Sequence, residues 1–271
     1  MSKISIIVVC LNPGKKLIDT MESILRQTSK DYEVVVKDGF SKDGSIDLLK
    51  EWLAGAGAKI ADKVHIYQMQ DKSIYEAMNQ ATELATGEFL DFLNCGDHVY
   101  NDGALESMLE EMSKYPEGML FYGNVYDAIR KSVVQSNPQI DAFACYRNVP
   151  CHQACIYHKN LFAERGYEPK YRVRADYEHF LRCFFEKKVT PIWVPVTLAL
   201  YEGGGFSETK ANRIRSKEEH SQIISMYMTK EQIFKYKMIM LLSLQPVRTA
   251  MAESKLLGSF YQAVKKALYR R

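Results

Sequence analysis

The sequence lacks any long uninterrupted apolar run, although 46% of its 271 residues are hydrophobic. The longest late run, residues 238–244, falls far short of the about 18 apolar residues that a membrane-spanning helix needs. The apolar stretch at residues 4–11 has neither the long hydrophobic region nor the cleavage site of a secretory signal. We therefore expect a cytoplasmic protein with a substantial core.

The number of cysteines and the net charge do not indicate a particular function. The six cysteines lack the paired CxxC spacing of a zinc site, and scattered thiols of this kind are usually reduced and inert. The 36 basic and 33 acidic residues nearly cancel, which leaves a net charge of +3. The basic excess lies near the C-terminus, where nine Lys and Arg but two Glu follow from Lys230 onward. No motif of a nucleic-acid-binding fold accompanies it, so we expect no nucleic-acid partner.

Two common phosphate-binding motifs are missing. The pair Gly55 and Gly57 lacks a third glycine and follows a predicted helix, which is typical of a helix C-cap. No Walker-type lysine loop is present. These absences count against a P-loop enzyme and against a methyltransferase or oxidoreductase of the dinucleotide-binding type.

What the sequence does contain is an alternation of strands and helices. Apolar runs predict strands at residues 4–11, 33–37, 64–68 and 88–93, and helical spacing predicts helices at 17–25, 45–53 and 74–86. Later segments at 121–125, 153–158 and 192–201 read as strands, 176–185 as a helix, and the chain from 210 onward as helical and charged. This order predicts an α/β domain with a mostly parallel sheet.

Acidic residues follow the ends of the predicted strands. Asp38 and Asp97 come directly after strands, and Asp71 follows the third strand by a few residues. Ligands bind at the carboxyl edge of such sheets. A single Asp at this position more often forms a turn or caps a helix, but three gathered carboxylates repel one another unless a cation or donors are present. The set therefore favours a binding site.

Four segments, in order and spacing, resemble the family 2 glycosyltransferases with the GT-A fold. They are VVCLNPGKKL at 8–17, KDGFSKDGS at 37–45, DKSIYEAMNQATELATGEFLDFLNCGD at 71–97, and 151–207 with its CHQACIYHK, RADYEHFLR and EGGGFS stretches. The third is similar to the bacterial subgroup that builds colanic acid, capsule and O-antigen. The resemblance implies a Rossmann-like, nucleotide-diphospho-sugar transferase domain over residues 1–210, followed by a helical, basic extension over 211–271.

The resemblance also implies which residues bind the donor. Val9, Asp38, Asp71 and Asn94 match positions that line the nucleotide and its sugar. Asp97 matches the metal-binding position of the DxD-like motif, although the second Asp of many relatives is absent. A divalent cation there, Mn²⁺ or Mg²⁺, would stabilise the leaving diphosphate.

Asp176 matches the general base that takes the proton of the acceptor hydroxyl. From the residues alone, Asp176 could equally cap its own helix with Arg174 or Arg182 as an ion-pair partner, and Glu178 is the second choice for the base. The pair His152 and Gln153 matches positions near the donor or acceptor sugar. Gly204 belongs to a glycine-rich loop that resembles one folding over the diphosphate, or it forms an ordinary surface turn.

The C-terminal segments 233–244 and 256–269 mix apolar residues with lysine and arginine. Basic amphipathic helices bind anionic membrane surfaces, so we expect a peripheral contact and a polyprenyl-diphosphate-linked saccharide as acceptor. The alternative is that these helices pack on the catalytic domain or form a dimer contact. The sequence as a whole predicts an inverting transferase that uses a nucleotide sugar, with UDP as the expected nucleotide, to extend a surface polysaccharide. The rival hypothesis is a nucleotide-sugar-binding or assembly protein of the same fold without turnover.

Overall fold

The computed structural model describes residues 3–203 and 209–242. A first compact unit ends at Ile223 and a second begins at Ile224. Gly204 with its glycine-rich loop, and the predicted segment at 256–269, lie outside the described residues. Across the described ranges, no helix is both long and apolar enough to cross a bilayer.

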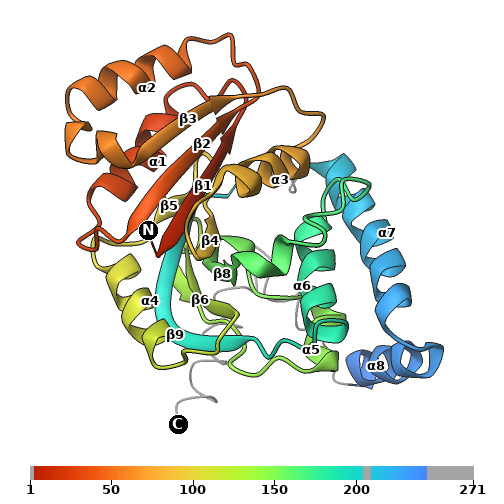
Figure 1. The fold of residues 1–271 in the computed structure, drawn as a ribbon. Helices are drawn as coiled ribbons and strands as arrows, with labels where there is room; N and C mark the ends of the chain where they lie inside the picture. Colours follow the sequence, from red (N-terminus) through yellow and green to blue (C-terminus); the bar gives the residue numbers. More distant parts are fainter. Residues whose placement is uncertain (1–2, 204–208, 243–271) are drawn as a thin grey trace. The chain divides into compact units, whose positions relative to one another are not determined.

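A mixed sheet of nine strands forms the framework of the first unit (Figure 1). The strands are β1 (Ile4–Cys10), β2 (Tyr32–Asp38), β3 (Val64–Gln68), β4 (Phe89–Phe92), β5 (His98–Val99), β6 (Leu120–Asp127), β7 (Ser132–Val134), β8 (Cys155–His158) and β9 (Ile192–Tyr201). Eight of them follow the order β3-β2-β1-β4-β8-β6-β9-β5, and β7 pairs with β6. The first four are parallel, whereas β8 runs antiparallel to both β4 and β6.

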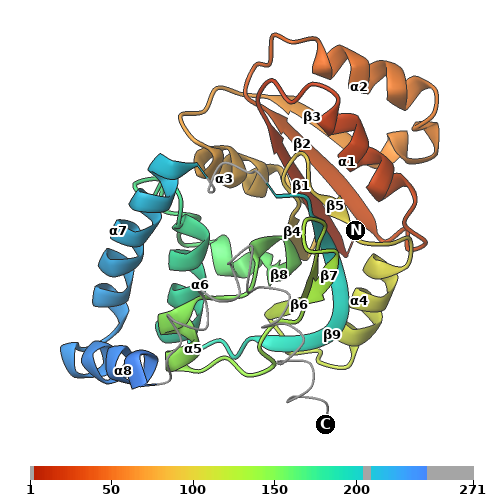
Figure 2. The same ribbon diagram turned by 180° about the vertical axis from the view of Figure 1, so that it is seen from behind.

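Helices cover both faces of the sheet (Figures 1 and 2). The helices of the described chain are α1 (Lys16–Leu25), α2 (Ser45–Ala54), α3 (Ile74–Leu84), α4 (Ala104–Ser113), α5 (Ala142–Arg147), α6 (Ala175–Phe185), α7 (Lys210–Tyr227) and α8 (Lys230–Leu242), with short 3-10 turns η1 (Ala58–Lys63), η2 (His152–Ala154) and η3 (Lys159–Phe162). The apolar sides of α1, α2 and α4 join one core with alternate residues of the central strands. The opposite face is covered by α3 and α6.

The sequence pattern explains why these elements form. All seven residues of β1 are buried, as expected for a strand covered by helices on both faces. At the start of α3, the Ser73 side chain accepts a hydrogen bond from the backbone N–H of Glu76, which is an N-cap. Burial of each large aliphatic side chain in this core contributes about 1.5–3 kcal/mol to stability.

An aromatic cluster fixes α6 to the sheet. The Phe162 ring stacks on the imidazole of His179 at 4.0 Å between centroids, and Tyr157 and Tyr167 contact the same imidazole edge-on. Phe92 of β4 packs on Tyr167 and Phe162. Because α6 begins at Ala175, this packing determines where the first turn of α6 lies relative to the end of β4.

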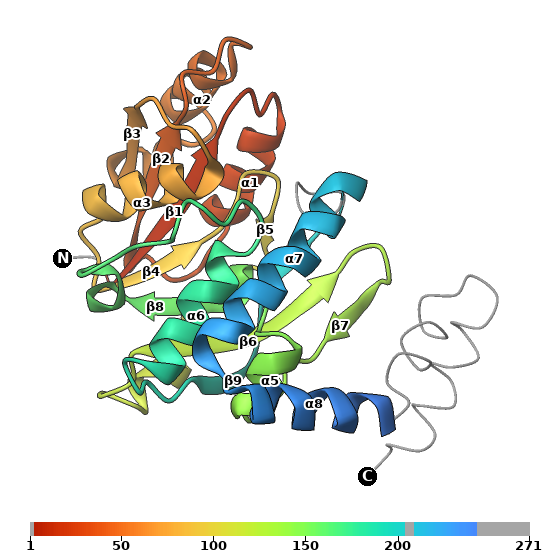
Figure 3. The same ribbon diagram turned by 90° about the vertical axis from the view of Figure 1, so that its right-hand side faces the viewer.

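The first part of α7 belongs to the first unit and contacts the segment that precedes α6 (Figure 3). The buried Glu219 carboxylate accepts hydrogen bonds from the backbone N–H groups of Arg172, Val173 and Arg174 at 2.8, 3.0 and 2.9 Å. Three donors compensate the cost of burying this carboxylate. The clamp fixes the backbone that leads directly into Asp176.

Candidate active site

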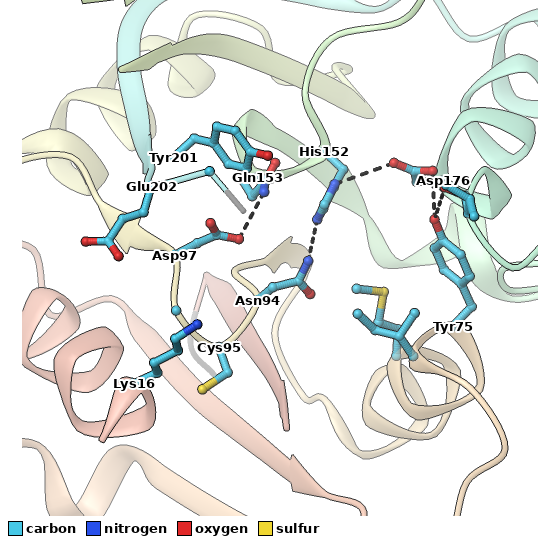
Figure 4. Close-up of a pocket in the computed structure, with 15 residues that line it drawn as sticks. Lys16, Tyr75, Asn94, Cys95, Asp97, His152, Gln153, Asp176, Tyr201 and Glu202 are labelled. Carbon is cyan, nitrogen blue, oxygen red and sulfur yellow. Dashed lines mark hydrogen bonds and ion pairs between the residues drawn. The ribbon is translucent and has the colours of Figure 1, made fainter. Parts of the chain in front are cut away.

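Three adjoining cavities lie near the carboxyl ends of β1 and β4. The central cavity, of about 260 Å³, is lined by residues that include Lys16, Tyr75, Asn94, Asp97, His152, Gln153, Asp176 and Glu202 (Figure 4). The β1-side cavity, of about 430 Å³, is lined by residues that include Val9, Asp71, Lys72, Ile74 and Arg172. The α5-side cavity, of about 670 Å³, is lined by residues that include Arg147, Asn148, His152, Arg174 and Asp176. Shared walls make the three cavities neighbours: Ile74 separates the first two, and His152 with Asp176 separates the first from the third.

Asp97 lies at the end of a tight turn after β4. Its backbone N–H donates to the carbonyl of Asn94 at 2.9 Å, and Gly96 adopts φ +100°, a left-handed conformation that glycine permits. The Thr20 hydroxyl of α1 donates to the Asp97 carbonyl and accepts from the Gly96 N–H. The turn therefore holds the Asp97 carboxylate over the cavity floor.

Burial raises the pKa of the Asp97 carboxyl above its ordinary value, although a 2.9 Å hydrogen bond from Gln153 Nε2 opposes the shift. A cation that binds to the unshared oxygen of this partly desolvated carboxylate stabilises its charged form.

His152 links Asn94 to Asp176. Its Nε2 lies 2.8 Å from Asn94 Nδ2, and its Nδ1 lies 3.5 Å from Asp176 Oδ2 (Figure 4). Burial lowers the pKa of the imidazole, but the hydrogen bond and charge of Asp176, with the charges of Asp97 and Asp91, raise it overall. The HQ pair thus binds three site residues, since Gln153 holds Asp97 while His152 holds Asn94 and Asp176.

Asp176 faces the cavities from the first turn of α6. The single hydroxyl proton of Tyr75 is shared between Asp176 Oδ1, at 3.0 Å, and the Val173 carbonyl, at 2.8 Å. Burial raises the pKa of the carboxyl, but the His152 contact, the backbone N–H of Tyr177 and the Tyr75 hydroxyl together bring it below the ordinary value. Asp176 is therefore ionised at neutral pH.

The alternatives for Asp176 that the sequence left open are not seen. Arg174 is the N-cap residue of α6, and no side chain caps this helix. The Arg182 guanidinium donates to the carbonyls of Arg165 and Gly166 instead of pairing with Asp176. Glu178, the second choice for a base, is buried and forms an ion pair with Arg165 at 2.5 Å.

Asp71 and Asp38 lie near the β1-side cavity in different states. Asp71 lines this cavity and forms an ion pair with Lys37, whose side chain is fully buried. Asp38 is fully buried as well, and its carboxylate accepts from the Ser41 N–H and hydroxyl and from Gln68 Nε2. Asp38 therefore shapes the turn after β2, whereas Val9 and Asp71 face the cavity.

The residues present fit a divalent cation that takes part of its coordination from a ligand. Across residues 3–203 and 209–242 no group of three His, Cys, Asp or Glu side chains is arranged to hold a metal. Asp97 is a half-buried carboxylate with one oxygen unshared, and Glu202 lines the same cavity. Mg²⁺ and similar ions are commonly held by one or two carboxylates together with substrate phosphates.

Sequence reasoning missed three polar side chains of the central cavity: Lys16, Tyr75 and Glu202. Lys16 begins α1, Tyr75 lies in the first turn of α3, and Glu202 follows β9. All three follow the end of a predicted strand within a few residues or one turn. This place in the chain is the signal that could have identified them.

Comparison with known proteins shows the family. The glycosyl transferase family 2 profile matches residues 5–168. A PGL/p-HBAD biosynthesis glycosyltransferase of Mycobacterium bovis (strain BCG) is 33% identical over 207 residues, which are 76% of this chain and 79% of that protein. The chain therefore belongs to glycosyl transferase family 2, and it is a glycosyltransferase.

Solved structures show the same fold. TarS of S. aureus, residues 1–349 in complex with UDP, is similar over 94% of this chain and 76% of that chain, with a TM-score of 0.65 and 15% identity. A longer TarS structure is covered to 46% of its length, so this chain spans about half of it. The mannosyltransferase PcManGT of Pyrobaculum calidifontis, in complex with GDP-Man and Mn²⁺, gives a TM-score of 0.66 at 15% identity over 98% of this chain and 80% of that chain. The GT-A fold expected from the sequence is confirmed.

Proposed function

We propose that this glycosyltransferase moves a sugar, with inversion, from a UDP-sugar to a lipid-linked saccharide during assembly of a surface glycan at the inner face of the cell membrane. The observation that carries the proposal is that Asp97 and Asp176 line one central cavity, with further cavities on both sides. Similar proteins support the class of pathway and donor. They include a teichuronic acid biosynthesis glycosyltransferase of Bacillus subtilis and structures with UDP or UDP-GlcNAc.

In this mechanism the nucleotide occupies the β1-side cavity, and its diphosphate and sugar extend into the central cavity. Arg172 of the β1-side cavity and Lys16 of the central cavity supply positive charge toward the phosphates. Asn94 Oδ1 is buried and has no hydrogen-bond partner in the described chain, so it is available to a sugar hydroxyl. A Mn²⁺ or Mg²⁺ ion held by Asp97, with Glu202 close by, would neutralise the charge that develops on the diphosphate.

Asp176 is the general base. The acceptor oxygen forms a bond to the anomeric carbon while the bond from that carbon to the diphosphate breaks, and the hydroxyl proton moves to Asp176. Its lowered pKa keeps this carboxylate ionised at neutral pH, and His152 and Tyr75 fix its orientation. A single base opposite the leaving group gives an inverted product.

The test is donor binding and turnover in the full chain with Asp97→Ala. We expect the wild type to bind a UDP-sugar more tightly with Mn²⁺, and to hydrolyse or transfer it. Asp97→Ala should lose the metal-dependent part of the affinity, by about tenfold or more. The exposed Asp102→Ala is the matched control and should behave as the wild type. Binding without turnover on any lipid-linked acceptor extract supports the inactive rival, and no binding of any nucleotide sugar contradicts the proposal.

A further inference from the structure

The α5-side cavity has a different chemical character from the other two. It lies across the His152–Asp176 pair from the central cavity, and its remaining walls include residues of α5, of the loop after α5, and Ser216 of α7. Figure 3 shows α5, α6 and the first part of α7 gathered beside one another. A group bound in this cavity lies next to Asp176 without occupying the central cavity.

Arg174 is held in one position on the wall of this cavity. Its Nε donates to Ser216 Oγ at 2.8 Å, and its Nη1 donates to Asn148 Oδ1 at 3.0 Å. The guanidinium lies 5.3 Å from the ring centroid of Tyr177. Glu219 holds the Arg174 backbone as well. The side chain therefore loses little further entropy when it binds a ligand.

This fixed arginine has no acidic partner in the part of the chain that the structure describes. Asp176 is the one carboxylate among the described residues that line the cavity, and it contacts His152 and Tyr75 instead. A second guanidinium, that of Arg147 at the end of α5, lines the same cavity. Because Arg174 and Asp176 do not pair with each other, the Arg174 guanidinium makes this cavity attractive to an anion.

A purely structural role explains only part of this arrangement. Bridging Ser216 and Asn148 uses Nε and Nη1 of Arg174, but Nη2 makes no hydrogen bond to the described residues. The planar guanidinium fork matches phosphate and carboxylate oxygens, which it can bind with two parallel hydrogen bonds.

We propose that the α5-side cavity is a subsite for an oxyanion carried by the acceptor saccharide, a phosphate or a carboxylate, which Arg174 and Arg147 bind. This inference rests on one part of the proposed function, which is that Asp176 takes its proton from a hydroxyl of the acceptor. The anion would then hold the acceptor at a fixed distance from the base. A phosphate would come from the link to the lipid, and a carboxylate from an acidic sugar.

The experiment measures binding of small probes to the full chain by titration calorimetry. The probes are inorganic phosphate, methyl glucuronide and, as a neutral match, methyl glucoside. Each is titrated with and without saturating UDP and Mg²⁺, because UDP keeps phosphate out of the donor side. We expect phosphate or methyl glucuronide to bind at least about tenfold more tightly than methyl glucoside, as charge-assisted hydrogen bonds predict.

Variants locate the binding. Arg174→Gln and Arg147→Gln should each weaken the preferred anionic probe by about tenfold, whereas Lys16→Gln in the central cavity should leave it unchanged. If Arg174→Gln lowers the melting temperature strongly, its weaker binding could come from loss of structure. The test then rests on Arg147→Gln, because Arg147 is exposed. Preference for phosphate indicates the lipid link, and preference for the glucuronide indicates an acidic sugar.

Three results would overturn the subsite: equal affinity for charged and neutral probes, unchanged affinity in both arginine variants, or loss of binding in Lys16→Gln. The first two mean that the cavity does not select anions, and the third means that the probe binds on the donor side. Failure of the proposed function is a separate outcome. It appears as absent UDP binding in the wild type, while the titrations without nucleotide still test the anion site.

Discussion

At the scale of single residues, Asp176 is the side chain whose replacement should separate binding from chemistry. Asp176→Asn keeps the size of the side chain but cannot accept the proton, so we expect kcat to fall by about 10²–10⁴-fold. The donor dissociation constant should stay as in the wild type, because in the proposed mechanism Asp176 contacts the acceptor hydroxyl and not the donor. Transfer assays and donor titrations measure both quantities. Glu186→Gln at the exposed end of α6 is the control, and a large loss of donor affinity in Asp176→Asn would contradict the role.

The His152–Asp176 pair should also make stability depend on pH. Burial lowers the pKa of His152. The hydrogen bond and the charge of Asp176 outweigh this effect, so the pKa of His152 in the fold is raised above 6.5. Its stabilising contribution is therefore complete below pH 6.5 and is lost as the pH rises through the raised value. The pKa of Asp176 is lowered below 3.8, so its contribution is present above pH 3.8 and is lost as the pH falls through the lowered value.

His152→Gln tests this linkage. The melting temperature of the wild type should exceed that of the variant most between pH 3.8 and 6.5, and the difference should shrink at higher pH. Thermal unfolding followed by circular dichroism over this range and above it measures the difference. A difference that is constant with pH, or that grows as the pH rises, would refute the pairing.

Sequence reasoning grouped some of the residues that line the central cavity and left others unseen. Asp97 and Asp176 were expected near one another, and they line one cavity. The internal hydrogen bonds of Asp38 were not visible, because Gln68 comes from a neighbouring strand and only the folded sheet brings it close. Tyr75 was overlooked because an aromatic residue at helical spacing usually belongs to the core. The roles of all these residues stay predictions.

At the scale of elements, Glu219 of α7 should control the geometry of the first turn of α6. Glu219→Gln removes the charge that three backbone N–H groups share, so we expect the free energy of unfolding to fall by about 1–3 kcal/mol. Because the Val173 carbonyl and Asp176 both accept from Tyr75, kcat should fall while the donor dissociation constant stays unchanged.

Denaturant unfolding and steady-state kinetics measure these effects. Glu218→Gln, at the exposed neighbouring position of the same helix, is the matched control and should be close to the wild type. If Glu219→Gln unfolds as the wild type and keeps its kcat, α7 does not position the base.

The main elements were predictable because their patterns are long and regular. The structure has α3 at Ile74–Leu84 and β1 at Ile4–Cys10, within two residues of the predicted bounds. The helix α4 was missed although Leu105, Met108 and Met112 have helical spacing and are buried. β5 and β7 have two and three residues, too few for a periodic pattern, so only pairing with β9 and β6 defines them.

At the scale of the whole molecule, the three cavities give the proposed reaction a direction. The nucleotide side, the central cavity and the acceptor side follow one another across the carboxyl edge of the sheet, and Asp176 stands between the last two. The α/β class, the family and the transferase activity were predicted from the sequence and are confirmed. The membrane contact remains a prediction. The helix α8 of the second unit contains most of the predicted segment 233–244.

The α8 helix exposes large apolar side chains together with lysines. Phe234, Leu241 and Leu242 are 67%, 61% and 76% exposed, and Lys230 and Lys237 belong to the same helix. Such a surface suits the interface of an anionic bilayer, where apolar side chains enter the headgroup region and lysines stay with the lipid phosphates.

The prediction is that the double variant Phe234→Ser with Leu241→Ser lowers partitioning into anionic vesicles by at least about tenfold, since each large apolar side chain contributes about 1.5–3 kcal/mol when fully buried. Ile214→Ser on α7 makes a similar change at another exposed site and should have no effect. Vesicle sedimentation measures both, and vesicles of neutral lipid should bind the wild type more weakly because the lysines gain nothing there. Should the double variant and Ile214→Ser sediment alike, α8 is not the membrane contact. Donor hydrolysis by the double variant should remain at the wild-type level, because its two changes lie in the second unit and the catalytic side chains lie in the first.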